Sequence, residues 1–301
     1  MAAARGVLCP LPTQESRMPR KTARADGTAP AALPYWQPPV SGGKPFSLSG
    51  FAPAAKPFST GDKAEDKLAV KALATEINEL QDMLFADGRY KLLVVLQGTD
   101  ASGKDGAIRD VFGQVSPLGV HARSWRAPSA EERAHDFLWR IHQRVPATGE
   151  LTIFNRSHYE DVLVPVVDGA LTREQTTQRF RQINDFERML VETGTVLLKF
   201  MLHISRKEQA LRLQARIDDP TKAWKFVPHD LEVRRQWRAY HKAYEAFLGA
   251  TSTAVAPWTI VPSDSKTHRN LMIATVVRDT LKSMKLRYPP PAPEVAGARV
   301  T

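Results

Sequence analysis

A glycine-rich segment, GTDASGKDG, carries the clearest chemical signal in the chain. It follows a short apolar run, Leu92 to Leu96, and precedes residues with helical spacing. Glycines let the backbone turn its N–H groups inward at the start of a helix, where they and the helix dipole hold anionic oxygens. The spacing of Gly98, four residues, Gly103 and Lys104 matches the pattern G-x-x-x-x-G-K, in which the lysine adds a mobile positive charge. A tight strand-to-helix turn is the simpler alternative, but strand, spacing and lysine occur together and favour a phosphate site.

The residue after the lysine departs from that pattern. Asp105 stands where Ser or Thr is expected, so the hydroxyl that usually contacts magnesium is missing. A carboxylate must then hold the metal, and Asp100, inside the loop, is the nearest candidate. We therefore expect Mg²⁺ as the cofactor.

A second polar cluster follows the apolar run Leu151 to Phe154 and reads NRSHYED. An arginine and two carboxylates at that point would lie at the carboxyl edge of a parallel sheet, where ligands of open α/β folds bind. Asn155 occupies the strand end at which P-loop enzymes commonly carry an acidic magnesium ligand, and Asn is a poor anchor for that metal. Ser157 and Glu160, three residues apart, also fit a helix capping box.

Strand-like and helix-like segments alternate between residues 63 and 286. Alternating strands and helices require a parallel sheet covered on both faces. The expected strands are Leu92–Leu96, Val120–Trp125, Leu151–Phe154, Val196–Ile204 and Pro257–Val261. The expected helices are Lys63–Phe85, Lys104–Val115, Ala130–Arg144, Arg173–Thr193 and Lys266–Leu286.

The segment Ser205 to Gly249 breaks this alternation. It is rich in Lys and Arg and predicts two helices joined by DDPTKAWKFVPHD. A cationic helical hairpin beside a phosphate-binding sheet is typical of a lid that closes over phosphates and excludes water. Trp125, Trp224 and Phe226 are candidates for stacking a base, although packing beneath the lid explains them as well.

The ends of the chain differ from its middle. Residues 1–60 are rich in Ala, Pro and basic residues without a regular period, so we expect a leader that is disordered or draped on the core. Residues 61–288 form the expected domain, with the lid at about 205–249, and the Pro-rich residues 289–301 form a tail. Met18 is a second candidate start of translation.

Composition narrows the class of protein. The only cysteine, Cys9, excludes a disulfide framework, and no apolar run reaches the ~18 residues of a membrane span. We expect a cytoplasmic protein without a membrane partner. A net charge of +10 suits a polyanionic partner, although it is also compatible with a solvated basic face.

Five segments together resemble the second family of polyphosphate kinases: GTDASGKDG, SWRAPS, AHDFLWRIH, IFNRSHYEDVLV and DDPTKAWKF. The NRSHYED form is similar to the branch that accepts both AMP and ADP. The resemblance covers Lys63 to Tyr288 and implies a thymidylate-kinase-like P-loop fold: three α/β/α layers, a parallel five-stranded sheet and a helical lid. It implies magnesium-dependent phosphoryl transfer between inorganic polyphosphate and nucleotides. VPVV follows the third motif where relatives often carry an arginine.

The resemblance also assigns roles to residues of this chain. Asp100 would organise magnesium, Lys104 would bridge donor and acceptor phosphates, and Arg156 would stabilise charge on the transferring group. Metal or nucleotide binding would involve Glu160 and Asp161. Phosphates would be gripped by Arg126, Arg216, Lys222 and Lys225. The rest of the predicted binding site comprises Gly98, Ala101, Ser102, Gly103, Asp105, Gly106, Asn155, His158 and Tyr159.

The expected partners are polyphosphate and ADP, AMP or ATP, with guanine nucleotides as further candidates and a homo-oligomer as the assembly. An ordinary ATP-dependent nucleoside monophosphate kinase remains an alternative, as does a non-enzymatic polyanion binder. No nucleic-acid recognition motif is found, and no NKxD motif supports a GTPase.

Overall fold

A computed structural model describes residues 37–38, 45–295 and 298–299 of the chain. Its strands form one parallel sheet, as the alternation of segments predicts. They are β1 (Lys91–Gln97), β2 (Val120–Ser124), β3 (Leu151–Asn155), β4 (Thr195–His203) and β5 (Trp258–Pro262). The spatial order is β2-β3-β1-β4-β5, so β1 lies at the centre, paired with β3 and β4.

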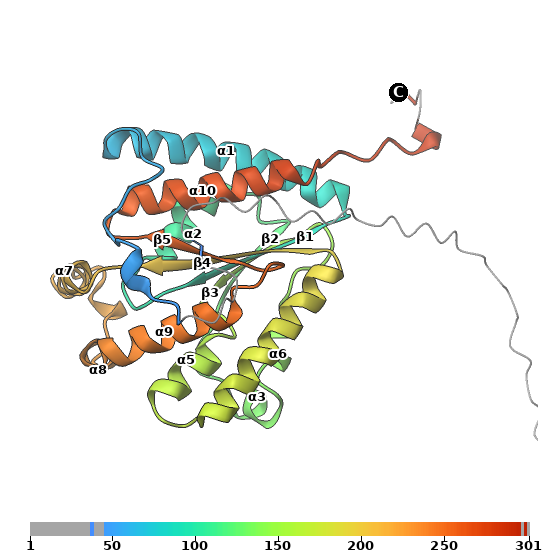
Figure 1. Cartoon of the computed structure of the whole chain (residues 1–301). Helices are drawn as coiled ribbons and strands as arrows, with labels where there is room; N and C mark the ends of the chain where they lie inside the picture. The colour runs from blue at the N-terminus through green and yellow to red at the C-terminus, as the bar shows by residue number, and fades with distance from the viewer. Residues whose placement is uncertain (1–36, 39–44, 296–297, 300–301) are drawn as a thin grey trace, which may run out of the picture.

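Helices cover both faces of the sheet (Figure 1). One face carries α1 (Lys63–Asp87), α2 (Lys104–Phe112) and α10 (Lys266–Ser283). The other carries α5 (Glu160–Val167), α6 (Arg173–Glu192) and α9 (Trp237–Thr251). Two further helices, α7 (Arg206–Ile217) and α8 (His229–Arg235), lie beyond the arrowhead of β4, at the carboxyl ends of the strands.

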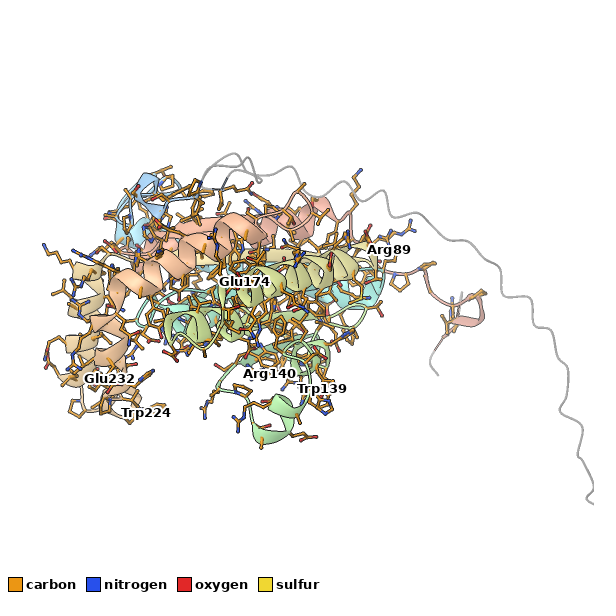
Figure 2. The ribbon with its side chains drawn as sticks, turned by 60° about the horizontal axis from the view of Figure 1, so that its bottom comes forward. Arg89, Trp139, Arg140, Glu174, Trp224 and Glu232 are labelled. Carbon is orange, nitrogen blue, oxygen red and sulfur yellow. The ribbon has the colours of Figure 1, made fainter. Side chains whose placement is uncertain are left out.

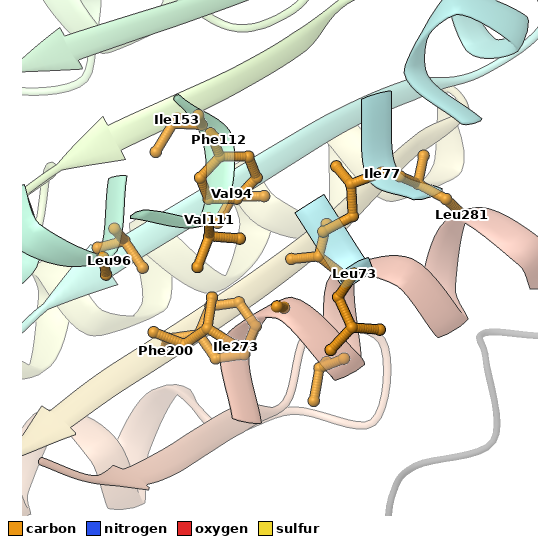
Figure 3. Packing of buried hydrophobic residues seen from close by; sticks show 14 of the residues in the cluster. Leu73, Ile77, Val94, Leu96, Val111, Phe112, Ile153, Phe200, Ile273 and Leu281 are labelled. Carbon is orange, nitrogen blue, oxygen red and sulfur yellow. The ribbon is translucent and has the colours of Figure 1, made fainter. Parts of the chain in front are cut away.

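The apolar run of β1 is buried because the strand is covered on both faces. Successive side chains point to opposite faces, so Val94 joins the core under α1, α2 and α10 while Val95 joins the core under α5, α6 and α9. Figure 3 shows the first core, where Ile77 of α1 lies next to Leu281 of α10 and Ile273 of α10 lies next to Phe200 of β4. The two cores clamp the central strand and fix where its carboxyl end opens into the glycine loop.

The single helix expected over Ala130–Arg144 is wrong. The structure has two short helices instead, α3 (Ala130–Ala134) and α4 (Trp139–His142). His135 is extended, and Asp136 Oδ1 accepts a hydrogen bond from the backbone N–H of Leu138. A carboxylate that captures a nearby backbone N–H competes with the helix, which explains the interruption.

The segment Ser205–Gly249 contains three helices rather than two. The third, α9, packs against α5 and α6 and buries Tyr240, Tyr244 and Phe247 in the second core. Only α7, the 3-10 turn Ala223–Lys225 and α8 extend beyond the edge of the sheet. The part that can act as a lid is therefore shorter than predicted, and its movement stays a prediction.

Part of the expected leader packs on the domain. Leu48, in the 3-10 turn Leu48–Gly50, is 2% exposed, and its backbone N–H donates to Glu245 Oε1 at 2.8 Å. The carbonyl of Pro53 accepts from the backbone N–H of Asp264 at 3.1 Å. Residues 45–60 therefore contact the domain at these two points, and the predicted extent of the leader stays a prediction.

Other expectations about the ends of the chain stay untested. Cys9 and Met18 lie outside the described residues. The described tail residues include one 3-10 turn, Pro293–Val295. In the described ranges no helix is both long and apolar enough for a bilayer.

Candidate active site

The glycine loop joins the end of β1 to the start of α2, as predicted. Gly103 has φ 104°, and a Cβ atom there would overlap the guanidinium of Arg269. A Cβ at Gly98 would lie 2.7 Å from the carbonyl oxygen of Leu202 in β4. Both positions therefore need glycine, and the loop is pressed closely against its neighbours.

Lys104, the first residue of α2, is buried within this loop. Its Nζ donates to the carbonyl oxygens of Gly98 at 2.6 Å and Thr99 at 3.2 Å. Burial, followed by the nearby positive charge of Arg156, lowers the pKa of Lys104 to about 8. The ammonium thus lacks full compensation for the water it has lost, which favours an anionic ligand.

Arg156 reaches the loop from the end of β3. Its backbone has φ 64°, a left-handed conformation that is strained for arginine, and its N–H donates to the Leu96 carbonyl at 3.0 Å. Its guanidinium Nη2 lies 2.8 Å from Asp100 Oδ1. The structure therefore brings together Asp100, Lys104 and Arg156, the three predicted catalytic residues.

A second cross-link joins the two loops. The side-chain amide of Asn155 donates to Asp105 Oδ1 at 2.7 Å, in the first turn of α2. Asn155 therefore links the end of β3 to the start of α2, while its predicted role in binding phosphate or nucleotide stays a prediction.

Glu160, at the start of α5, lies beside the cations. It accepts a hydrogen bond from Gln97 Nε2, and Gln97 Oε1 accepts one from Ser157 Oγ at 3.3 Å. Burial raises the pKa of Glu160, and the charges of Arg156 and Lys104 oppose that shift. Gln97 was not predicted, although its place directly before Gly98 is a usable signal.

Three side chains hold the outer side of the loop and were not assigned to the site from sequence. Arg212 donates to the carbonyl oxygens of Ala101 at 3.0 Å and Ser102 at 3.1 Å. Arg269 donates to the same Ser102 oxygen at 3.2 Å, and Gln209 donates to the Asp100 carbonyl at 3.1 Å. Donors that occupy the loop carbonyls leave the amide groups on the other side for a ligand.

Two hydroxyl groups in the loop, Thr99 Oγ1 and Ser102 Oγ, are buried without a hydrogen-bond partner among the described residues. Buried polar atoms are normally satisfied, so unsatisfied ones indicate a missing ligand or water. Carboxylate oxygens are the donors that Mg²⁺ prefers. Oδ2 of both Asp100 and Asp105 has no hydrogen bond to the described part of the chain, because Arg156 and Asn155 contact only Oδ1. The loop residues therefore fit a hard cation bound together with phosphates.

Two of the predicted lid cations, Arg216 and Lys222, pair with acidic residues of the lid itself rather than with the loop. Arg216 Nη1 is 3.7 Å from Asp230 Oδ2, and Lys222 forms an ion pair with Asp219. Burial and then the charge of Asp100 raise the pKa of Asp230. The side chain of Lys225 lies outside the described residues.

The remaining predicted cation, Arg126, is exposed at the end of the second strand. Its carbonyl accepts a hydrogen bond from Arg140 Nη1 at 2.9 Å.

The binding roles expected for His158 and Tyr159 are not supported. Both side chains are fully buried in the core, where Tyr159 Oη donates to Glu187 Oε1 at 2.7 Å. His158 Nε2 lies 3.4 Å from the same oxygen. Both residues belong to a buried network that also contains Lys199.

Asp161 does not join Asp100 at the predicted metal site. Both of its carboxylate oxygens accept hydrogen bonds from Arg140 Nη2, at 2.9 and 3.1 Å. The expected capping box is also wrong, because α5 begins after Tyr159 without a side-chain cap and Ser157 Oγ accepts from the Tyr159 N–H at 3.3 Å.

Trp125 and Trp224, both predicted candidates for stacking a base, lie in different environments. Trp125 packs edge-on against Phe154 with ring centroids 5.2 Å apart, under the guanidinium of Arg140, so packing explains it. Trp224 is 75% exposed, and its indole N–H donates to the Thr221 carbonyl at 3.0 Å. In Figure 2 it lies near Glu232 at the end formed by α7 and α8. Base stacking by Trp224 stays a prediction.

Comparisons with known proteins agree with this geometry. A family model described as Polyphosphate kinase 2 matches residues 60–289. The chain is 47% identical over 255 residues to the AMP/ADP-polyphosphate phosphotransferase of Meiothermus ruber, which covers 85% of this chain and 95% of that protein. It is 36% identical over 266 residues to the ADP-polyphosphate phosphotransferase of Rhodopseudomonas palustris, covering 84% and 92%. A crystal structure of polyphosphate kinase 2 from Arthrobacter aurescens superposes with a TM-score of 0.82 at 41% identity, covering 86% and 93%.

Proposed function

Because the chain belongs to the polyphosphate kinase 2 family, we propose that it transfers phosphoryl groups between inorganic polyphosphate and adenine nucleotides, with ADP and AMP as acceptors. The motifs that indicated this family in the sequence lie within the matched residues. Two relatives support the choice of acceptors, one named for AMP and ADP and the other for ADP.

One observation carries the proposal. Lys104 and Arg156, two cations that repel each other, converge on a loop that requires glycine, and Lys104 is buried with hydrogen bonds only to carbonyl oxygens. Such an arrangement is unfavourable in the free protein and becomes favourable when phosphate oxygens arrive. Anion binding therefore removes an electrostatic penalty already present in the fold.

The chain's own residues supply positioning and charge. The loop amides at the start of α2 hold phosphate oxygens, and Lys104 exchanges its carbonyl partners for the donor and acceptor phosphates. Arg156, supported by Asp100, stabilises charge on the group in transfer. Gln209 and Arg212 already bond α7 to the loop, so movement of the segment from Arg216 through α8 would bring Arg216, Lys222 and Lys225 to the phosphates and exclude water.

Mg²⁺ belongs to this proposal as the cofactor. Asp100 and Asp105 would hold it, and when bound it would neutralise charge on the phosphate oxygens. Asp161 is omitted because Arg140 occupies its carboxylate.

Guanine nucleotides as further acceptors, a homo-oligomeric assembly and a cytoplasmic location also remain proposals. They rest on the sequence resemblance and on composition alone.

The test uses polyphosphate as the only phosphoryl donor. With Mg²⁺ and ADP, and separately AMP, the purified full-length chain should form ATP or ADP, which chromatography detects. Lys104→Ala is the matched negative control. Absence of product with polyphosphate, together with activity when ATP and a nucleoside monophosphate are supplied, would replace this function with that of an ordinary nucleotide kinase.

A further inference from the structure

A basic groove lies outside the loop, on the face of the sheet covered by α1, α2 and α10. It has a volume of about 560 Å³, within the range of ligand pockets. Cations line it from all three helices: Lys67 and Lys71 from α1, Arg109 from α2, and Lys266 from the start of α10.

The groove carries a net positive charge that the protein does not neutralise. Its acidic side chain, Asp110, is already occupied, because Oδ1 accepts from Arg109 Nε at 3.0 Å and Oδ2 accepts from Asn270 Nδ2 at 2.8 Å. Lys67 and Lys71 lie one helical turn apart on α1, both exposed, and neither forms an ion pair with any described residue. The unpaired cations of the groove therefore favour the binding of an anion from solution.

The groove adjoins the outer side of the phosphate loop. Asn270, which lines the groove, accepts hydrogen bonds from Arg269 Nε at 3.0 Å and Nη2 at 2.8 Å. Arg269 Nη1 in turn donates to the Ser102 carbonyl of the loop at 3.2 Å. Lys266 also lines the groove, and burial followed by the charges of Arg212 and Arg269 lowers its pKa. The groove is therefore separated from the loop by one buried side chain, Arg269.

We propose that this groove binds the distal phosphates of a long polyphosphate chain whose end reacts at Lys104. This inference rests on the proposed function. Only the terminal phosphates of a polymer can lie in the loop, so the remaining ones must pass over the adjacent protein surface. A surface with several unneutralised cations next to the loop is where their charge is best accommodated.

The groove therefore sets a preference for chain length. A short donor such as tripolyphosphate fills the loop without reaching Lys67 and Lys71, whereas a long polymer contacts both regions. The second contact acts at high effective concentration and lowers the KM for the long chain without changing the chemical step. Contacts between exposed charges weaken with added salt, so the preference should decline as ionic strength rises.

The test is the double variant Lys67→Glu/Lys71→Glu in the full-length chain. We expect its KM for long-chain polyphosphate to rise about fivefold to tenfold, which corresponds to about 1–1.4 kcal/mol for the two exposed ion contacts together. Its kcat, its KM for tripolyphosphate and its KM for ADP should stay within about twofold. Equilibrium binding of labelled long-chain polyphosphate, measured without nucleotide, should weaken in parallel.

The matched control is Arg181→Glu/Arg188→Glu on α6, which changes the net charge equally on the opposite face of the sheet. It should leave the preference for long chains intact, and thermal unfolding checks that both variants fold. Equal losses of affinity for long-chain polyphosphate in the two variants, or a rise in KM for tripolyphosphate or for ADP, would contradict the proposal that the groove binds the distal phosphates. If the wild-type enzyme uses no polyphosphate at all, the proposed function itself fails.

Discussion

Lys199 and Lys104 are both buried, but their ammonium groups have different hydrogen-bond partners. Lys199, in β4, donates to Glu187 Oε2 at 2.6 Å, to Tyr159 Oη at 3.0 Å and to the Thr251 carbonyl at 2.8 Å. Lys104, at the start of α2, donates hydrogen bonds only to carbonyl oxygens, and the nearby carboxylates of Asp100, Glu160 and Asp105 act on it at a distance, against the charge of Arg156. Burial lowers both pKa values, but a bonded carboxylate opposes the shift only for Lys199.

The difference separates a structural charge from a functional one. A buried ion pair that is fully hydrogen-bonded satisfies its own members and needs nothing from solution. A buried cation without a bonded carboxylate is a poor contributor to stability and a good receptor for phosphate. Substitution of either lysine should reveal this contrast.

Lys104→Ala should cause the largest loss of function. We expect kcat/KM to fall about 10³-fold or more, because the ammonium that contacts the transferring phosphates is removed. Thermal unfolding should remain within about 1 kcal/mol of wild type, since an incompletely compensated charge leaves the interior. Marked destabilisation would mean that Lys104 is part of the structural core.

Lys199→Ala should show the opposite pattern. Glu187 would be left as a buried carboxylate without its cation, and stability should fall by about 3–5 kcal/mol in denaturant unfolding. The double variant Lys199→Met/Glu187→Leu removes both charges and should recover much of that loss. A single variant as stable as wild type would remove the distinction between the two lysines.

Arg156→Ala should lower kcat about 10²-fold to 10³-fold and change the KM for polyphosphate much less, because its charge is needed most as the phosphoryl group moves. Arg156→Lys keeps a charge on the same left-handed backbone and should recover part of the rate. Steady-state kinetics in both substrates separates the two effects. Equal losses in kcat and in affinity would assign Arg156 to substrate binding.

The pH dependence of phosphate binding should report the loss of the proton from Lys104. With a pKa of about 8 in the free enzyme, the ammonium is present below that pH and lost as pH rises through it. The affinity for tripolyphosphate should therefore decline above about pH 8. In Arg156→Ala the inflection should move upward, because a repelling charge is gone. An unchanged inflection in that variant would argue against the two cations sensing each other.

The smallest expected effect concerns the loop backbone. Ala101 has φ 62°, which disfavours a residue with a Cβ, so Ala101→Gly should raise stability by about 0.5 kcal/mol after the entropy of glycine is included. Ala72→Gly on the exposed surface of α1 is the control and should lower stability by about 1 kcal/mol. Differential scanning calorimetry of the two variants measures both signs.

The sequence by itself determined the parallel sheet and the position of the glycine loop. Apolar runs, glycine spacing and a single lysine are local signals, and they correctly placed Gly98, Gly103 and Lys104 where β1 ends. Helical spacing likewise located α1, α6 and α10 to within a few residues.

Only the tertiary structure decided which polar residues serve the site. Within NRSHYED, Asn155 and Arg156 face the loop, whereas His158 and Tyr159 turn into the core and Asp161 pairs with Arg140. In the tertiary structure α9 packs in the second core, and donors distant in sequence, such as Arg269, contact the loop. Composition and spacing cannot report this, because the direction of a side chain at a turn depends on local backbone angles and on which distant segments supply its partners.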